Sequence, residues 1–163
     1  MPRALIFAMA ALLLAGATQA AEVIRHKIPN SDFPIARAVE VPAGVTMVHL
    51  SGAGPAVADA AATPNSVASF GNTRVQTVST LKAIEAQLVA LKLGMKDVVR
   101  MQVFLVGDPA MNGAMDFDGF MDGYRQFFGS AAQPNLPVRS TVKVAGLVNP
   151  GWLVEIEVSA ARP

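Results

Sequence analysis

The sequence of 163 residues contains no cysteine and only two histidines. Without cysteine, the chain has no disulfide, no thiol nucleophile and no site for a cysteine-linked lipid anchor. His26 and His49 stand far apart in the sequence, whereas a metal site gathers several ligands at close spacing. We therefore predict no metal, and we interpret His49, which lies in a predicted strand, as a packed or hydrogen-bonded imidazole.

An excess of charge of either sign is also lacking. Thirteen Lys and Arg residues stand against twelve Asp and Glu residues, and only Arg3 among them lies in the first twenty positions. The formal charges of residues 21–163 therefore cancel. A chain without a basic field does not attract nucleic acid or an anionic membrane, so we predict neither as a partner.

Long hydrophobic runs are absent except at the start of the chain. Arg3 precedes the apolar run "ALIFAMAALLLAG" at 4–16, and the small residues of "ATQA" follow at 17–20. This is the layout of a secretory signal peptide, and the run is shorter than the roughly 20 apolar residues of a membrane span. We predict cleavage after Ala20, a periplasmic or secreted location, and one domain over 21–163.

The periodicity of apolar residues predicts strands and helices in alternation. Strands are expected at 36–41, 45–52, 98–108, 140–146 and 152–160, with helices at about 72–94 and 110–128. The apolar residues that predict one face of each element are Val75, Val78, Leu81, Ile84, Leu88 and Leu91 in the first helix, Met111, Met115, Phe120, Tyr124, Phe127 and Phe128 in the second, and Trp152, Val154, Ile156 and Val158 in the last strand. We predict loose chain at 21–34, a loop at 53–69 and a hairpin at each end of the domain. The order ββαβαββ indicates an α+β fold, a mixed sheet with two helices on one face. The other face is then expected to be buried in a homo-oligomer.

Several short motifs resemble functional sites but fail on spacing. "DFDGFMDG" at 116–123 resembles a calcium loop, yet its glycine comes too early and position twelve is Phe127 rather than Glu. "GAGP" at 52–55 has no Lys-Ser/Thr after it and is too short for a phosphate loop. No Gly-x-Ser-x-Gly motif is present.

Two of the predicted strands carry the remaining candidates. In "PVRSTVKVAGL" at 137–147, Arg139, Thr141 and Lys143 share one side, and in 152–160 Glu155 and Glu157 share one side. If the two strands pair as a hairpin, Arg139, Thr141 and Glu155 point to the same face, unless a bulge near the turn reverses the parity. The alternative is an exposed Lys–Glu pair and a solvated arginine.

The same segment resembles the C-terminal signature of the RidA family, the reactive intermediate deaminases of YjgF type. The pattern "LPVRSTVKVAGL…VEIEVSA" is accompanied, in order, by "HLSGAGP" at 49–55, by the helix and strand at 80–108, and by "GYRQFFG" at 123–129. The resemblance covers about 34–161. It implies a chorismate-mutase-like fold and a homotrimer with ligand clefts between subunits.

The resemblance also implies an activity, namely hydrolysis of enamines and imines such as 2-aminoacrylate to 2-oxoacids and ammonia, without a cofactor. Arg139 would hold the carboxylate of the imino acid, and Glu155 would position or activate water. Ser51 and Gly52 would line the cleft. Arginine suits the first role because its guanidinium binds a carboxylate bidentately.

Two positions depart from the pattern of the deaminases. A tyrosine often follows the proline near the mature N-terminus, but Ile35 stands there, and a cysteine is often found where this chain has Thr141. We expect both residues to be in the site, Ile35 against the substrate and Thr141 beside the reaction. The alternative function is a non-catalytic trimer that binds small carboxylates in the same clefts.

Overall fold

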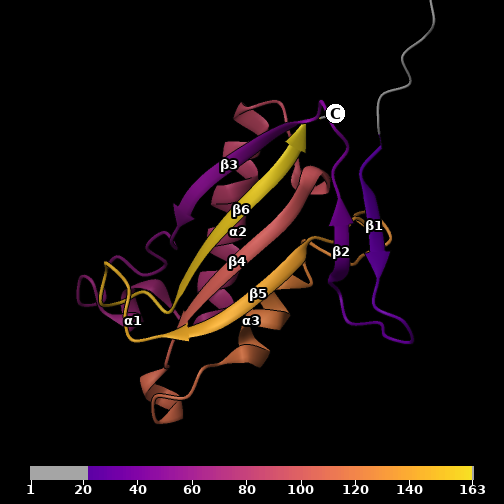
Figure 1. Ribbon diagram of the computed structural model, residues 1–163. Coiled ribbons are helices and arrows are strands. Elements are labelled where there is room, and N and C mark those ends of the chain that lie inside the picture. The colour runs from indigo at the N-terminus through magenta and orange to yellow at the C-terminus, as the bar shows by residue number, and fades with distance from the viewer. Residues whose placement is uncertain (1–21, 163) are drawn as a thin grey trace, which may run out of the picture.

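The computed structural model describes residues 22–162, so the predicted signal peptide and its cleavage point lie outside the described residues. The main sheet has the order β3 (Thr46–Ala53), β6 (Val154–Arg162), β4 (Val98–Val106) and β5 (Val138–Val144) (Figure 1). β6 is antiparallel to both of its neighbours, whereas β5 runs parallel to β4. The sheet is therefore mixed, as predicted.

A second, smaller sheet stands beside the β5 edge of the first (Figure 1). It pairs β1 (Ile24–Lys27) with β2 (Ala36–Glu40), and the amide of Ala36 donates to the carbonyl of Pro137 at 2.9 Å. Two predictions were wrong here. The stretch 21–34 contains a strand rather than loose chain, and β2 pairs with β1 rather than forming a hairpin with β3.

Two helices pack against one face of the main sheet (Figure 1). α2 (Thr73–Ala90) begins where predicted, because the Asn72 side chain accepts the amide of Val75 at 3.0 Å. α3 (Phe117–Tyr124) is shorter than the predicted 110–128. Left-handed residues at 112 and 113 interrupt that stretch, and Asp116 then caps the helix.

Three short helical turns complete the secondary structure. α1 (Val67–Phe70) lies at the end of the predicted loop, and 3-10 turns span Met95–Asp97 and Pro109–Met111. The fold class is confirmed as α+β with a mixed sheet and two helices on one face. Within residues 22–162, no helix is both long and apolar enough to cross a membrane.

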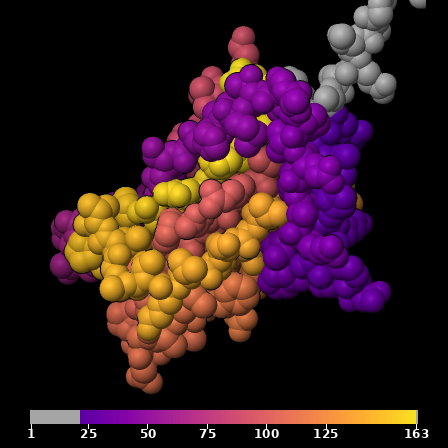
Figure 2. Space-filling model, in the orientation of Figure 1, coloured from indigo at the N-terminus to yellow at the C-terminus, as the bar shows by residue number. Residues whose placement is uncertain are grey.

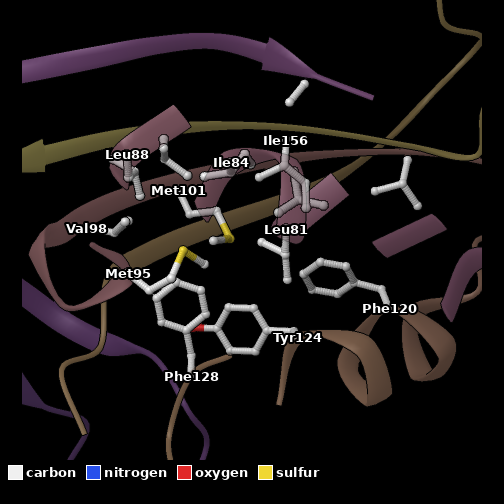
Figure 3. Packing of buried hydrophobic residues seen from close by; sticks show 14 of the residues in the cluster. Leu81, Ile84, Leu88, Met95, Val98, Met101, Phe120, Tyr124, Phe128 and Ile156 are labelled. Atoms are coloured by element: carbon white, nitrogen blue, oxygen red, sulfur yellow. The ribbon is translucent and has the colours of Figure 1, made fainter. Parts of the chain in front are cut away.

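The core lies between the sheet and these two helices (Figure 3). α2 contributes Leu81, Ile84 and Leu88, which are fully buried, while α3 contributes Phe120 and Tyr124. Full burial of each large aliphatic side chain stabilises the fold by about 1.5–3 kcal/mol. Aromatic contacts continue through the core, since the rings of Tyr124 and Phe128 are stacked 4.9 Å apart.

The buried face of α2 turns polar toward its N-terminus. Gln76 is fully buried, donates to the carbonyl of Gly151 at 3.0 Å, and accepts the amide of Leu153 at 2.7 Å. The predicted apolar stripe began at Val75, which is 44 % exposed. The amide side chain therefore satisfies two backbone groups just before β6, the carbonyl of Gly151 and the amide of Leu153.

The opposite face of the main sheet is left uncovered by the helices and faces the viewer in Figures 1 and 2. Its central strands present polar side chains such as Gln102 and Glu157 together with Phe104, all partly exposed. Val142 on β5 is 42 % exposed on the same face. This face is therefore neither a solvated polar surface nor a continuous apolar one.

Candidate functional site

Arg139 is the second residue of β5 and lies on the side of the sheet that the helices cover. Its register partner on β4 is Met101, whose own partner on β6 is Val158. Partners in register share a face of the sheet, and Met101 and Val158 are both buried under the helices. The local sequence therefore directs the guanidinium toward α3 at the edge of the sheet.

Four aromatic rings surround this guanidinium, and we call them the Arg139 box. The distances from Arg139 Cζ to the ring centroids are 4.4 Å for Tyr124, 4.9 Å for Phe120, 5.5 Å for Phe33 and 5.9 Å for Phe117. Ring faces attract a cation at such distances. The box fixes the position of a positive charge with contacts that use none of its hydrogen-bond donors.

The hydrogen-bonding capacity of Arg139 is largely unused. Nη2 contacts the sulfur of Met121 at 3.2 Å, and Nη1 is buried without a hydrogen-bond partner among residues 22–162. The described part of the chain places no carboxylate within 4.0 Å of the guanidinium. Arg139 as a whole is half-buried, and a partly buried cation with an unpaired donor is costly.

Burial controls the protonation of both polar members of the site. It lowers the pKa of the Arg139 guanidinium from its usual value and raises the pKa of the Tyr124 phenol above its usual range. Tyr124 therefore keeps its proton, and its hydroxyl donates to the carbonyl of Pro34 at 2.8 Å. This hydrogen bond ties α3 to the segment that carries Phe33.

Thr141 and Ile35 lie on the Arg139 side of the molecule. Thr141 shares a face with Arg139, because its register partner is the buried Val103, and its hydroxyl is buried without a partner within residues 22–162. Ile35 directly follows Pro34 and is half-buried in a pocket that also includes Phe33. The structure therefore brings Arg139, Thr141 and Ile35 to the same region.

Glu155 lies on the uncovered face, together with Ser51 and Gly52. Its register partner on β4 is Phe104. Because side chains alternate along a strand, Phe104 faces the opposite side of the sheet from Met101. A Cβ added at Gly52 would stand 2.4 Å from Glu155 Oε1. Glycine at this position thus leaves the space that the carboxylate occupies, and the exposed Ser51 precedes it at the end of β3.

The predicted hairpin between the last two strands was therefore wrong, and so was the single face for Arg139, Thr141 and Glu155. β5 and β6 run in opposite directions, but β4 lies between them. The pairing through β4 places Arg139 with Val158 and Glu155 with Phe104. One chain holds two separate clusters, the Arg139 box on the helix side and the Glu155–Gly52 cluster on the uncovered face.

A third polar group occupies the uncovered face at the far end of β6. His49 Nδ1 and the Ser159 hydroxyl are 2.8 Å apart, so the imidazole is hydrogen-bonded as predicted, although His49 is exposed rather than packed. Asp116 of the calcium-like motif caps α3 through the amide of Gly119. Among residues 22–162, no three His, Asp or Glu side chains are grouped as metal ligands.

The sequence did not reveal two members of the Arg139 box. Phe33 lies in the stretch predicted to be loose, and Phe117 was not assigned to the apolar stripe of the second helix. Phe120 and Tyr124 were assigned to that stripe, but only as core residues. The helical spacing of Phe117, Phe120 and Tyr124 was the one signal that they share a face.

Comparison with known proteins identifies the family. The model of the family described as Endoribonuclease L-PSP matches residues 33–162. No curated protein matches the chain closely enough to count as a relative.

Several solved structures share the fold. YyfB of Yersinia pestis, of the conserved Rid protein family, superposes with a TM-score of 0.63 at 22 % identity, covering 86 % of this chain and 98 % of its own. Escherichia coli TdcF with bound serine superposes with a TM-score of 0.56 at 28 % identity, covering 86 % of this chain and 98 % of its own. A Mycobacterium tuberculosis member of the YjgF/YER057c/UK114 family superposes with a TM-score of 0.53 at 26 % identity, covering 86 % of this chain and 100 % of its own. The chain therefore belongs to the YjgF/Rid family, to which the Endoribonuclease L-PSP model corresponds.

Proposed function

We propose that this protein hydrolyses 2-imino acids and their enamine forms, such as 2-aminoacrylate, to 2-oxoacids and ammonia. The observation that carries the proposal is the half-buried guanidinium of Arg139, whose Nη1 has no hydrogen-bond partner within residues 22–162. A guanidinium of this kind binds a carboxylate bidentately when the carboxylate reaches it. The relative TdcF was solved with bound serine, an amino acid that carries such a carboxylate.

The reaction needs orientation and proton transfer but no cofactor. An enamine takes a proton at its terminal carbon to become the imine, and water then adds to the imine carbon. The tetrahedral adduct loses ammonia and becomes the 2-oxoacid. Glu155 accepts a proton from the attacking water and returns one to the leaving nitrogen, a role that typically accelerates a reaction about 10²- to 10⁴-fold. Thr141, beside Arg139, contributes its backbone and hydroxyl to the site.

The active site in this proposal is composed from two copies of the chain. Arg139 is on the edge strand β5, whereas Glu155 is on the uncovered face of the sheet. When the β5 edge of one copy meets the uncovered face of the next, each contact contains one Arg139 and one Glu155. Contacts between unlike surfaces form a ring when the rotation from one copy to the next closes, and a homotrimer is our proposal for the size of that ring.

The second candidate is a trimer that binds small carboxylates without turning them over. Arg139 and its box suffice for such binding, and the presence of Ile35 and Thr141 in place of the tyrosine and cysteine of the resembling deaminases favours it. Cleavage of RNA, which the family description names, fits this chain less well. The charges of residues 21–163 cancel, so the chain offers no net attraction to phosphate.

Release of ammonia and pyruvate from freshly generated 2-aminoacrylate tests the proposal. We expect release well above the rate in buffer for the unmodified protein, and a return to the buffer rate for Arg139→Ala. Arg74→Ala, which removes an exposed arginine of α2, is the matched control and keeps full activity. Release equal to buffer, with saturable binding of pyruvate, would favour the non-catalytic candidate.

A further inference from the structure

A half-open pocket of about 320 Å³ adjoins the Arg139 box. It lies between the segment around Phe33 and the loop that follows α3, from Gly129 to Leu136. Pockets of about 300 Å³ are at the small end of the range for ligand sites. The volume is large enough to hold the side chain of a small ligand.

The more buried part of the pocket is apolar. Pro34 is buried, and Ile28, Ile35 and Leu136 are half-buried. The charged lining residues Lys27 and Asp32, by contrast, are exposed. A group that enters far enough to leave solvent therefore meets hydrocarbon, while the charges stay at the rim.

Phe33 connects this pocket to the candidate anion site. It lines the pocket, and its ring centroid is 5.5 Å from Arg139 Cζ. It is also the most exposed ring of the Arg139 box, at 36 %, whereas Phe120 and Tyr124 are fully buried. Phe33 is thus shared by the box and the pocket, and a ligand whose carboxylate binds Arg139 on the Phe33 side can place its side chain in the pocket.

We propose that this pocket is a side-chain subsite, which makes 2-imino acids with branched or long apolar side chains better substrates than 2-aminoacrylate or the imine of alanine. The inference rests on the proposed function, because it places the carboxylate on Arg139. Burial of one methylene is worth about a fourfold gain in binding. The imine of leucine has three more carbons than the imine of alanine, so we expect at least about a tenfold higher kcat/KM.

The substrates for the test are imines of leucine and of alanine, each released in situ from the amino acid by an oxidase. Ammonia release by the full chain is measured for both. Ile28→Ala reduces the apolar lining, and we expect it to lower turnover of the leucine imine several-fold while leaving the alanine imine unchanged. Ile24→Ala, an exposed isoleucine in the same segment that does not line the pocket, is the matched control.

Binding gives a second readout that does not depend on turnover. Calorimetry compares 4-methyl-2-oxopentanoate, the product from leucine, with pyruvate, the product from alanine. We expect tighter binding of the longer oxoacid, and we expect Ile35→Asp to abolish that difference by placing a charge in the apolar part. Thermal melts of each variant show that the fold is kept.

The outcomes separate this inference from the function on which it rests. Equal kcat/KM and equal affinity for the two ligand lengths, with both lost in Arg139→Ala, would overturn the subsite and leave the proposed function standing. Loss of neither activity nor binding in Arg139→Ala would overturn the placement of the carboxylate on Arg139 and the subsite with it, whereas release no faster than in buffer would overturn the proposed function. A preference for the longer ligands that Ile35→Asp removes is the result we expect.

Discussion

The two clusters of this chain differ in how they are held. Arg139 is bordered by four rings on the helix side, and two of them, Phe120 and Tyr124, belong to the packed core. Glu155 is half-exposed on the uncovered face, next to a glycine and a serine at the end of a strand. The positive half of the site is thus preformed within one chain, whereas the acidic half lacks a covering partner within residues 22–162.

This difference teaches that a family motif can be complete in the sequence and still be divided in the fold. Rigid aromatic packing suits a group that must bind, because little conformational freedom is left to lose when the ligand arrives. An open carboxylate suits a group that must exchange protons with water. Each of the following predictions changes either the Arg139 box or the Glu155 cluster and leaves the other in place. They are given in order of decreasing expected effect on activity or stability.

The largest expected effect separates binding from turnover. Glu155→Gln keeps the shape of the side chain but removes its basicity, so we expect kcat to fall about 100-fold or more with affinity for pyruvate nearly unchanged. Arg139→Ala is expected to abolish that affinity. Steady-state kinetics and calorimetry on both variants check the split, and equal losses of binding in the two variants would contradict it.

The next effect concerns the support of the Arg139 box by the helices. Gly123 lies where α3 approaches α2, and a Cβ there would stand 2.7 Å from Cβ of Thr77. Gly123→Ala is therefore expected to lower the free energy of unfolding by about 1–3 kcal/mol. Urea denaturation measures the change, with Gly146→Ala as control because nothing lies within 4 Å of its added Cβ.

A smaller effect addresses the Glu155 cluster alone. A Cβ at Gly52 meets the far end of the Glu155 side chain, which can move aside, so Gly52→Ala should barely change the melting temperature. We expect kcat to fall about tenfold, because the displaced carboxylate no longer faces the attacking water. Unchanged kcat in this variant would mean that the position of the carboxylate is not set by Gly52.

The smallest effect concerns the link between Tyr124 and Pro34. Tyr124→Phe removes a buried hydrogen bond of 2.8 Å and should cost about 1 kcal/mol of stability. Because burial raises the pKa of this phenol in the folded state, the unfolded state loses its proton first as the pH rises. Stability should therefore fall above about pH 10, where a free tyrosine ionises. Urea denaturation from pH 9 to 11 measures this fall in the free energy of unfolding, and the fall should be smaller for Tyr124→Phe.

Much of the fold followed from local patterns. The helix was predicted at about 72–94 from its apolar spacing and is found at 73–90. The predicted alternation along the last strand, which put Val154, Ile156 and Val158 on one side, is confirmed, since all three are buried. Local signals suffice here because each element must bury one face. The fold class followed from the order of these elements.

The pairing of strands did not follow from the sequence. The turn residues at 147–151 correctly indicate that the chain reverses direction between β5 and β6, but a reversal does not make two strands neighbours. β4 lies between them, and the contacts that hold it there join residues that are distant in the sequence. One intervening strand changed which residues share a face, and with it the predicted union of Arg139 and Glu155.

The most direct test of the account mixes two inactive variants. Arg139→Ala and Glu155→Gln chains are unfolded together at equal amounts and refolded, and ammonia release from 2-aminoacrylate is measured. If each site joins Arg139 of one copy to Glu155 of another, about a quarter of the sites are intact and about a quarter of the activity returns. Each variant refolded alone is the control. No recovery from a mixture that reassembles into oligomers would contradict the composite site.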